Sequence, residues 1–178
     1  MPNRTSHVMA AIAVLMSTSA LAAESIKIDD LVVASPIGGP QGAAAMRAVY
    51  SFYDFWNTGD ETLLQQAVAA NFIDHTLPPG RPQGPEGPAF ASRQFRGAVP
   101  DLKVPVEKMI VAGNYVTVHM KFTGHFTGKL GQTQGGGQEI SFVATDLVKV
   151  EDGKIADNWH IGDNLTLLKQ MGIAHLDP

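Results

Sequence analysis

The chain has 178 residues, of which 44% are apolar and 17% charged, and its formal net charge is −4. This length and composition fit one packed globular domain, and the scattered basic residues argue against nucleic acid or anionic membrane surfaces as partners. The chain contains no cysteine, so no disulfide stabilises the fold.

The first 22 residues have the pattern of a secretory signal peptide. Arg4 gives a basic N-terminal region, Val8 to Met16 forms a short apolar run, and Ala20-Leu21-Ala22 supplies a small-x-small cleavage signal. The apolar run is shorter than the roughly 20 residues that a membrane-spanning helix needs. We therefore predict cleavage before Ala23 and a secreted or periplasmic protein with no membrane anchor after cleavage.

The mature chain is expected to begin with an extension and to continue as one domain. Residues 23–42 form the predicted extension, with a strand over 26–33 and a Pro- and Gly-rich connector after it. The predicted domain covers 43–178. Its first helix is expected over 43–57, because apolar residues recur there at steps of three and four.

The next part of the chain predicts two more helices separated by a loop. Thr58 and Glu61 stand at the spacing of a capping box and predict the start of the second helix. Residues 71–77 are expected to be irregular, and 78–85 to form a surface loop because prolines and glycines prevent a helix or a central strand there. A third helix is expected over 86–97.

The second half of the chain predicts a hairpin-connected antiparallel sheet. A short alternating segment at 102–106 predicts a first strand, and polar and apolar residues alternate cleanly over 115–126. A second inward row runs over 140–148, and the Asp152-Gly153 turn leads to the last strand. Helices followed by a hairpin sheet predict an α+β fold.

Asp146 interrupts the apolar row of its strand. A buried carboxylate costs several kcal/mol unless it is paired or protonated. The sequence therefore favours two interpretations equally: a functional acid, or half of a structural pair with an arginine or a tyrosine.

Three histidines are candidates for chemistry. His75 adjoins the proline-rich loop and is either functional or an ordinary hydrogen-bonded loop residue. His119 and His125 share one strand face but lie roughly 20 Å apart if the strand is extended, too far for one metal ion. We expect no metal site and interpret these two as surface or dimer-contact residues.

The last strand and the aromatic residues predict a ligand pocket. Alternation places Trp159 on one strand face, and Asn158 and His160 on the other. An apolar wall with a few polar groups suits a small apolar molecule, although Trp159 and Phe142 are also candidates for simple core packing. The predicted ligand contacts are Asn158, His160, Trp159, Phe126, Phe142 and Trp56.

Asp163 stands at the start of an apolar C-terminal helix. Backbone N–H groups favour its charged form, whereas apolar neighbours raise its pKa. The residue is therefore either a helix N-cap or an acid that moves protons.

Five segments together resemble the SnoaL-like polyketide cyclases, also described as predicted ester cyclases, of the nuclear transport factor 2-like superfamily. In order they are Asn57-Thr58-Gly59-Asp60, His75, Gly84-Pro85-Glu86-Gly87, Val99-Pro100-Asp101-Leu102 and the run from Asp152 to Gly172. The resemblance covers residues 43–173. It implies a cone-shaped fold with a curved antiparallel sheet wrapped around helices, a deep apolar pocket and commonly a homodimer.

The resemblance also implies ring closure by intramolecular aldol condensation without metal or cofactor. Asp163 matches the position of the acid/base carboxylate, whose pKa the apolar pocket would raise. His75, Asn158 and His160 are the implied donors to the enolate oxygen. Phe126 and Asn158 stand where the family usually has histidines.

These observations leave three functional hypotheses. The first is a cyclase or isomerase that acts on a small apolar carbonyl or ester compound, with Asp163, His75 and Asp146 as candidate catalytic residues. The second is a non-catalytic periplasmic ligand-binding module, and the third is a hydrolase or hydratase in which a carboxylate activates water. The fold alone does not decide among them.

Overall fold

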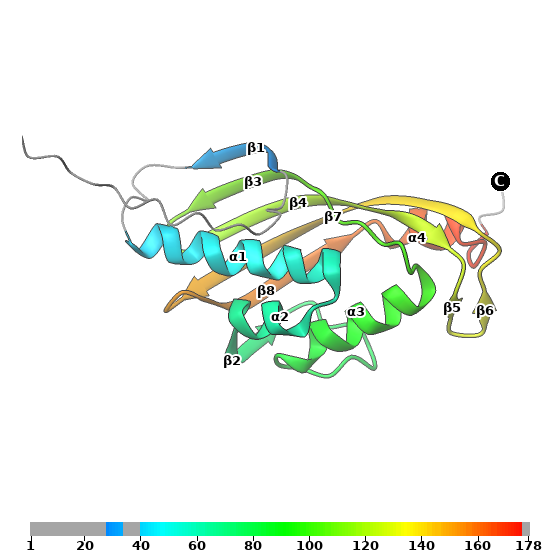
Figure 1. Ribbon diagram of the computed structural model, residues 1–178, viewed down its shortest axis with the longest axis horizontal. Coiled ribbons are helices and arrows are strands. Elements are labelled where there is room, and N and C mark those ends of the chain that lie inside the picture. The colour runs from blue at the N-terminus through cyan, green and yellow to red at the C-terminus, as the bar shows by residue number, and fades with distance from the viewer. Residues whose placement is uncertain (1–27, 34–39, 176–178) are drawn as a thin grey trace, which may run out of the picture.

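The computed structural model describes residues 28–33 and 40–175 (Figure 1); the predicted signal peptide and its cleavage site lie outside the described residues. Its helices are α1 (Pro40–Thr58), α2 (Glu61–Ala67), α3 (Glu86–Ala98) and α4 (Asn164–Gln170). Its strands are β1 (Ile28–Val33), β2 (Val68–Asp74), β3 (Val106–Ala112), β4 (Tyr115–Phe126), β5 (Lys129–Leu130), β6 (Thr133–Gln134), β7 (Gln138–Glu151) and β8 (Lys154–Gly162). The predicted α+β class is confirmed.

One curved sheet organises the molecule, with strand order β1-β3-β4-β7-β8-β2 (Figure 1). The pairs β3/β4, β4/β7 and β7/β8 are antiparallel, as predicted. The two edge strands differ from the prediction, because β1 pairs parallel with β3 and β2 pairs parallel with β8. A parallel pair needs a crossover connection, and in the chain several helices and strands separate each edge strand from its partner in the sheet.

Strand β2 occupies residues that were predicted as a helix end and an irregular segment. α2 ends at Ala67, and Val68 already has an extended backbone that opens β2. The register between β2 and β8 shifts between Val68 and Ile73. This shift breaks the alternation of burial along β2, which is why the sequence showed no strand period there.

Two smaller predictions were also wrong. The N-cap of α2 is Asp60, whose carboxylate accepts from the Thr62 N–H at 2.9 Å, whereas the Thr58 hydroxyl donates to the Asp54 carbonyl at the end of α1. In the segment 102–106, Lys103 forms an isolated bridge with Thr123, and only Val106 belongs to a strand, as the first residue of β3.

The core lies between α1 and the concave face of the sheet. Val49, Phe52 and Tyr53 of α1 are buried, and alternate residues of β4 and β7 face them. The predicted inward rows are confirmed, as is the turn at Asp152-Gly153, where both residues have positive φ angles of 48° and 73°. No described helix is long and apolar enough to cross a membrane.

Candidate functional site

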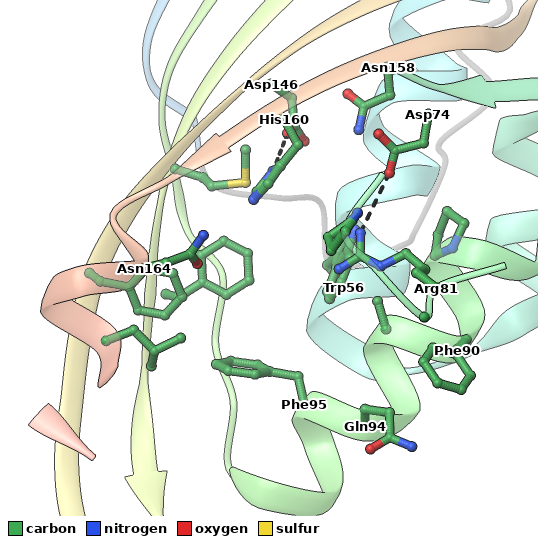
Figure 2. Close-up of a pocket in the computed structure, with 18 of the residues that line it drawn as sticks. Trp56, Asp74, Arg81, Phe90, Gln94, Phe95, Asp146, Asn158, His160 and Asn164 are labelled. Carbon is green, nitrogen blue, oxygen red and sulfur yellow. Dashed lines mark hydrogen bonds and ion pairs between the residues drawn. The ribbon is translucent and has the colours of Figure 1, made fainter. Parts of the chain in front are cut away.

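A cavity of about 430 Å³ opens between α1, α3, the loop after β2 and the concave face of the sheet. Its size is that of a small-molecule site. Aromatic rings form one wall: Phe122 and Phe142 stack at 4.9 Å, and Phe95 meets both rings edge-on at 6.0 and 6.1 Å. Figure 2 shows Phe95 of this wall together with polar residues that line the same cavity.

Asp146 and His160 form a direct polar contact in the lining of the cavity. They are directly paired across β7 and β8, and both line the cavity. The imidazole Nδ1 lies 2.6 Å from the Asp146 Oδ1 atom, and the Tyr53 hydroxyl donates to Oδ2 at 2.7 Å. Asp146 is therefore held at both oxygens, so it is paired with a tyrosine as one hypothesis required and also contacts a titratable group.

The charges of this cluster are set by burial and by Asp146. Burial, then the charge of Asp146 and the hydrogen bond to it, raise the pKa of Tyr53 well above 10.0, so its hydroxyl stays a donor. Burial lowers the pKa of His160, but the hydrogen bond to Asp146 and its negative charge outweigh this effect, and the net pKa lies above 6.5. His160 is therefore protonated more readily than a free imidazole, which makes it a stronger base.

The Asp146 contact also fixes which ring nitrogen of His160 can act. A carboxylate accepts from Nδ1–H, and the neutral imidazole then has its lone pair on Nε2. Within the described part of the chain, Nε2 makes no hydrogen bond, and His160 lines the cavity (Figure 2). Nε2 is the atom that a bound molecule would meet.

A second polar cluster joins β2 to the following loop. The Asp74 carboxylate is buried and accepts from the N–H and the hydroxyl of Thr76 at 2.9 and 3.1 Å. Its other oxygen lies 3.5 Å from Nη1 of Arg81. Asn158 pairs with Asp74 across the sheet, and its buried Oδ1 has no hydrogen-bond partner among the described residues.

Asp163 lies outside the cavity lining, at the exposed N-terminus of α4. Its carboxylate accepts from the Thr166 N–H at 3.0 Å and the Thr166 hydroxyl at 2.7 Å. These two hydrogen bonds lower its pKa below 3.8. The expected apolar surroundings and raised pKa were therefore wrong, and the geometry is that of a helix cap, which was the other interpretation.

His75 and Trp159 lie together on the outer face of the sheet. Their rings stack at a centroid distance of 4.3 Å, and His75 Nε2 lies 2.7 Å from an Asp157 oxygen. Neither residue lines the cavity. The expectation that both residues face the ligand was wrong. Alternate residues of β8 point to opposite sides of the sheet, so Asp157 and Trp159 lie on the side away from Asn158 and His160. His75 contacts Asp157 and Trp159 and therefore lies on that side as well.

The other predicted ligand contacts divide between cavity and core. Trp56, Phe142, Asn158 and His160 line the cavity, whereas Phe126 is fully buried and does not. Sequence reasoning missed the polar residues Tyr53, Asp74 and Arg81. Tyr53 was hidden in the apolar stripe of α1, and its hydroxyl at a buried position was the available signal.

The described residues contain no group of three or more His, Asp or Glu side chains able to hold a metal ion. His119 contacts Thr145 at 2.8 Å, and His125 contacts Asp101 at 2.7 Å. Both histidines lie on the side of β4 away from the inward row, as predicted.

Comparison with known proteins agrees with this architecture. The family model described as SnoaL-like polyketide cyclase matches residues 46–171. A polyketide cyclase candidate from Bacillus cereus ATCC 10987 is similar at 39% identity and a TM-score of 0.78, over 85% of this chain and 96% of its own. TsrD from Streptomyces laurentii shows 26% identity and a TM-score of 0.67, over 74% and 97% of the two chains.

A more distant structure shares the fold alone. A Catenulispora acidiphila protein with a ketosteroid isomerase-like fold superimposes with a TM-score of 0.57 at 19% identity, over 74% of this chain and 97% of its own. No curated protein sequence matches the chain.

Proposed function

Because the chain belongs to the SnoaL-like polyketide cyclase family, we propose that it catalyses proton transfer at a carbon next to a carbonyl group in a small, mainly apolar compound. The observation that carries this proposal is the Asp146–His160 contact in the lining of a cavity that has an aromatic wall. The acid/base role moves from Asp163 to His160, because Asp163 caps α4 outside the cavity.

The proposed step uses side chains of this chain alone. His160 Nε2 takes a proton from the α-carbon, the C–H electron pair passes into an enolate, and Asp146 stabilises the imidazolium that forms. Tyr53 holds Asp146 in place without taking part in the transfer. In a ring closure, the enolate carbon attacks a second carbonyl of the same molecule, and the His160 imidazolium returns its proton to the alkoxide that forms. In an isomerisation, the substrate also carries a C=C bond, so that the anion is a dienolate, and the imidazolium returns the proton to its γ-carbon.

The aromatic wall supports the acid/base role in a second way. It keeps water from one side of the reacting centre, and charges interact more strongly in such a medium than in bulk water. The Asp146 side chain is itself only 4% exposed, so its charge acts on His160 with less screening than in bulk water.

Exchange of α-protons in D₂O tests the proposal without knowledge of the natural substrate. The probes are 2-tetralone and ethyl 2-oxocyclohexanecarboxylate, followed by proton NMR against a protein-free control. We expect the wild type to accelerate exchange and His160→Gln to lose about 10²-fold or more of that acceleration. His119→Gln is the matched control, because His119 also contacts a neighbouring strand but lies away from the cavity.

Two outcomes would overturn the assignment. Equal exchange with wild type and His160→Gln would remove His160 as the base. Binding of the probes by the wild type without any exchange would favour the second candidate, a ligand-binding module. The position of Asp163 favours that candidate, because one expected proton-handling group is absent from the cavity.

We also propose that the protein is exported and forms a homodimer. Export is supported by the signal-peptide pattern of residues 1–22, and N-terminal sequencing of the secreted protein should begin at Ala23. The dimer is supported by an apolar outer face of the sheet, which we call the outer apolar face. Its exposed members are Ile73, Ile110, Tyr115, Val143, Leu147 and Ile161.

A further inference from the structure

The loop between β2 and α3 is fixed in place although it is rich in proline and glycine. The Gln83 side chain accepts from the Asp74 N–H at 2.8 Å and donates to the Asp74 carbonyl at 3.0 Å. The Thr76 hydroxyl accepts from the His160 N–H at 2.7 Å, which ties the loop to β8. The loop therefore holds Arg81 at the cavity as a defined part of its wall.

The Arg81 guanidinium has unused hydrogen-bonding capacity. Its Nη1 atom lies 3.5 Å from Asp74, which is longer than an N–H···O hydrogen bond. Within the described residues, this side chain donates no hydrogen bond to a protein acceptor. Figure 2 shows it joined to Asp74 by a dashed line, among the residues that line the cavity.

The contact with Asp74 does not occupy all the N–H donors of Arg81. One of its oxygens is occupied by the two hydrogen bonds from Thr76, and the other faces a single nitrogen of the guanidinium. A guanidinium has five N–H donors in a planar fork that matches a carboxylate. The donors that point away from Asp74 remain available to a molecule in the cavity.

Asn158 adds an acceptor to the cavity for which the described residues provide no donor. The residue is only 6% exposed, lines the cavity, and its Oδ1 atom has no partner among the described residues. A buried acceptor without a donor is unfavourable and calls for an explanation. A hydroxyl group of a bound molecule would supply that donor.

We propose that Arg81 and Asn158 form the polar end of the ligand site, and that the ligand is a hydroxy-substituted aromatic or alicyclic carboxylic acid. Arg81 binds the carboxylate, Asn158 Oδ1 accepts from the hydroxyl, and the ring system lies against Phe95, Phe122 and Phe142. This inference rests on the proposed function, because it identifies the substrate class of the same cavity.

Calorimetric binding of unreactive naphthalene derivatives tests the charge. 2-Naphthoate is compared with the neutral 2-naphthamide, which has nearly the same shape. We expect the wild type to prefer the carboxylate and Arg81→Met to bind it about 10- to 100-fold more weakly, with the amide little changed. Arg47→Met, a change at an exposed arginine of α1, should leave both affinities as they are.

A paired variant separates ligand binding from folding. Arg81→Met leaves the buried Asp74 without a cation, so the double variant Asp74→Asn/Arg81→Met removes both charges. This double variant should also lose the preference for 2-naphthoate over 2-naphthamide. Wild-type affinity for 2-naphthoate in either folded variant would overturn the role of Arg81.

The hydroxyl is tested with 3-hydroxy- and 6-hydroxy-2-naphthoate against 2-naphthoate. At least one of them should gain affinity with the wild type and lose this gain with Asn158→Leu. If neither gains, the hydroxyl part of the proposal is wrong. None of the naphthalene probes needs turnover, so failure here leaves the α-proton exchange test of His160 standing, and the reverse holds as well.

Discussion

At the scale of single residues, the position of a carboxylate matters more than its presence. Asp146 and Asp163 both looked suited to acid/base chemistry in the sequence. Asp146 lies on the inward face of β7, where Tyr53 and His160 contact its two oxygens. Both oxygens of Asp163 instead accept hydrogen bonds from the N–H and the hydroxyl of Thr166. Only the first can influence a proton transfer inside the cavity.

The Asp146–His160 contact predicts the pH dependence of α-proton exchange. Burial lowers the pKa of His160, and the hydrogen bond and charge of Asp146 raise it by more, so the pKa lies above 6.5. A base must be neutral, so exchange by the wild type should rise as the pH increases through this pKa. Asp146→Asn removes the charge but leaves the burial, and the midpoint should move to lower pH.

The measurement is a pH profile of kcat/KM, with an NMR titration of the His160 ring in both proteins. A midpoint that stays in place in Asp146→Asn would contradict the prediction. The same raised pKa makes the protonated pair stabilise the fold below pH 6.5, and this contribution is lost as the pH rises through the pKa of the folded state.

Asp163 yields a prediction about stability instead. Asp163→Ala removes the cap of α4 and should lower the thermal midpoint at neutral pH while leaving α-proton exchange unchanged. Because its pKa is lowered in the folded state, the stabilisation exists above pH 3.8 and is lost as the pH falls through the folded-state pKa. Thermal unfolding of the wild type and Asp163→Ala at neutral pH and below pH 3.8 measures this difference in stability. A variant with full stability and no exchange would restore Asp163 as the acid/base residue.

At the scale of elements, α3 and the loop before it form one unit. Gly87 is buried in α3, and a Cβ atom there would lie 2.5 Å from the Pro82 carbonyl oxygen. This close approach lets the backbone next to Arg81 pack directly on the helix. The glycine serves packing here and needs no unusual backbone angle.

Two glycine substitutions in α3 test this unit. Alanine favours a helix over glycine by about 1 kcal/mol, so Gly97→Ala, which meets no atom within 4 Å, should stabilise the fold. Gly87→Ala should instead destabilise it and weaken 2-naphthoate binding, because the backbone at Pro82 must move. Urea unfolding and calorimetry measure both effects. Equal stabilisation by the two variants would show that the loop does not depend on this contact.

At the scale of the whole molecule, the two faces of the sheet differ in what they contact. The concave face packs on α1 and lines the cavity, whereas the convex face carries the outer apolar face across β2, β3, β4, β7 and β8. Exposed apolar groups gathered on one face are typical of an interaction surface. A second copy of the chain is the partner that we propose.

A charge in the outer apolar face tests the dimer. A stable interface commonly buries about 800 Å² on each partner. Leu147 is one of the exposed members of the outer apolar face and lies opposite Trp159 in the paired strands β7 and β8. A lysine at this position would place a charge in the proposed interface, so Leu147→Lys should shift the protein toward the monomer in sedimentation-velocity experiments. Leu165→Lys changes another exposed leucine, which lies on α4 outside the outer apolar face, and is the control. A wild-type monomer at micromolar concentration would contradict the proposal.

The sequence by itself determined the class of fold and the inward rows of β4 and β7. The alternation through Val116, Val118 and Met120 is a local property, since each residue's face follows from its parity in the strand. The ordered segments from Asn57 to Gly172 also indicated the family. Asp146 was recognised as a charged residue at a buried position.

The tertiary structure decided which residues meet at the cavity. Asp146 and His160 lie on different strands, Tyr53 on α1 and Arg81 on a loop, and their meeting depends on the register of β7 with β8 and on where the loop folds back. The shifted pairing of β2 likewise left no period to detect. Periodicity reports the face of a residue within its own element, whereas contacts between elements depend on packing across long sequence separations, which local patterns do not encode.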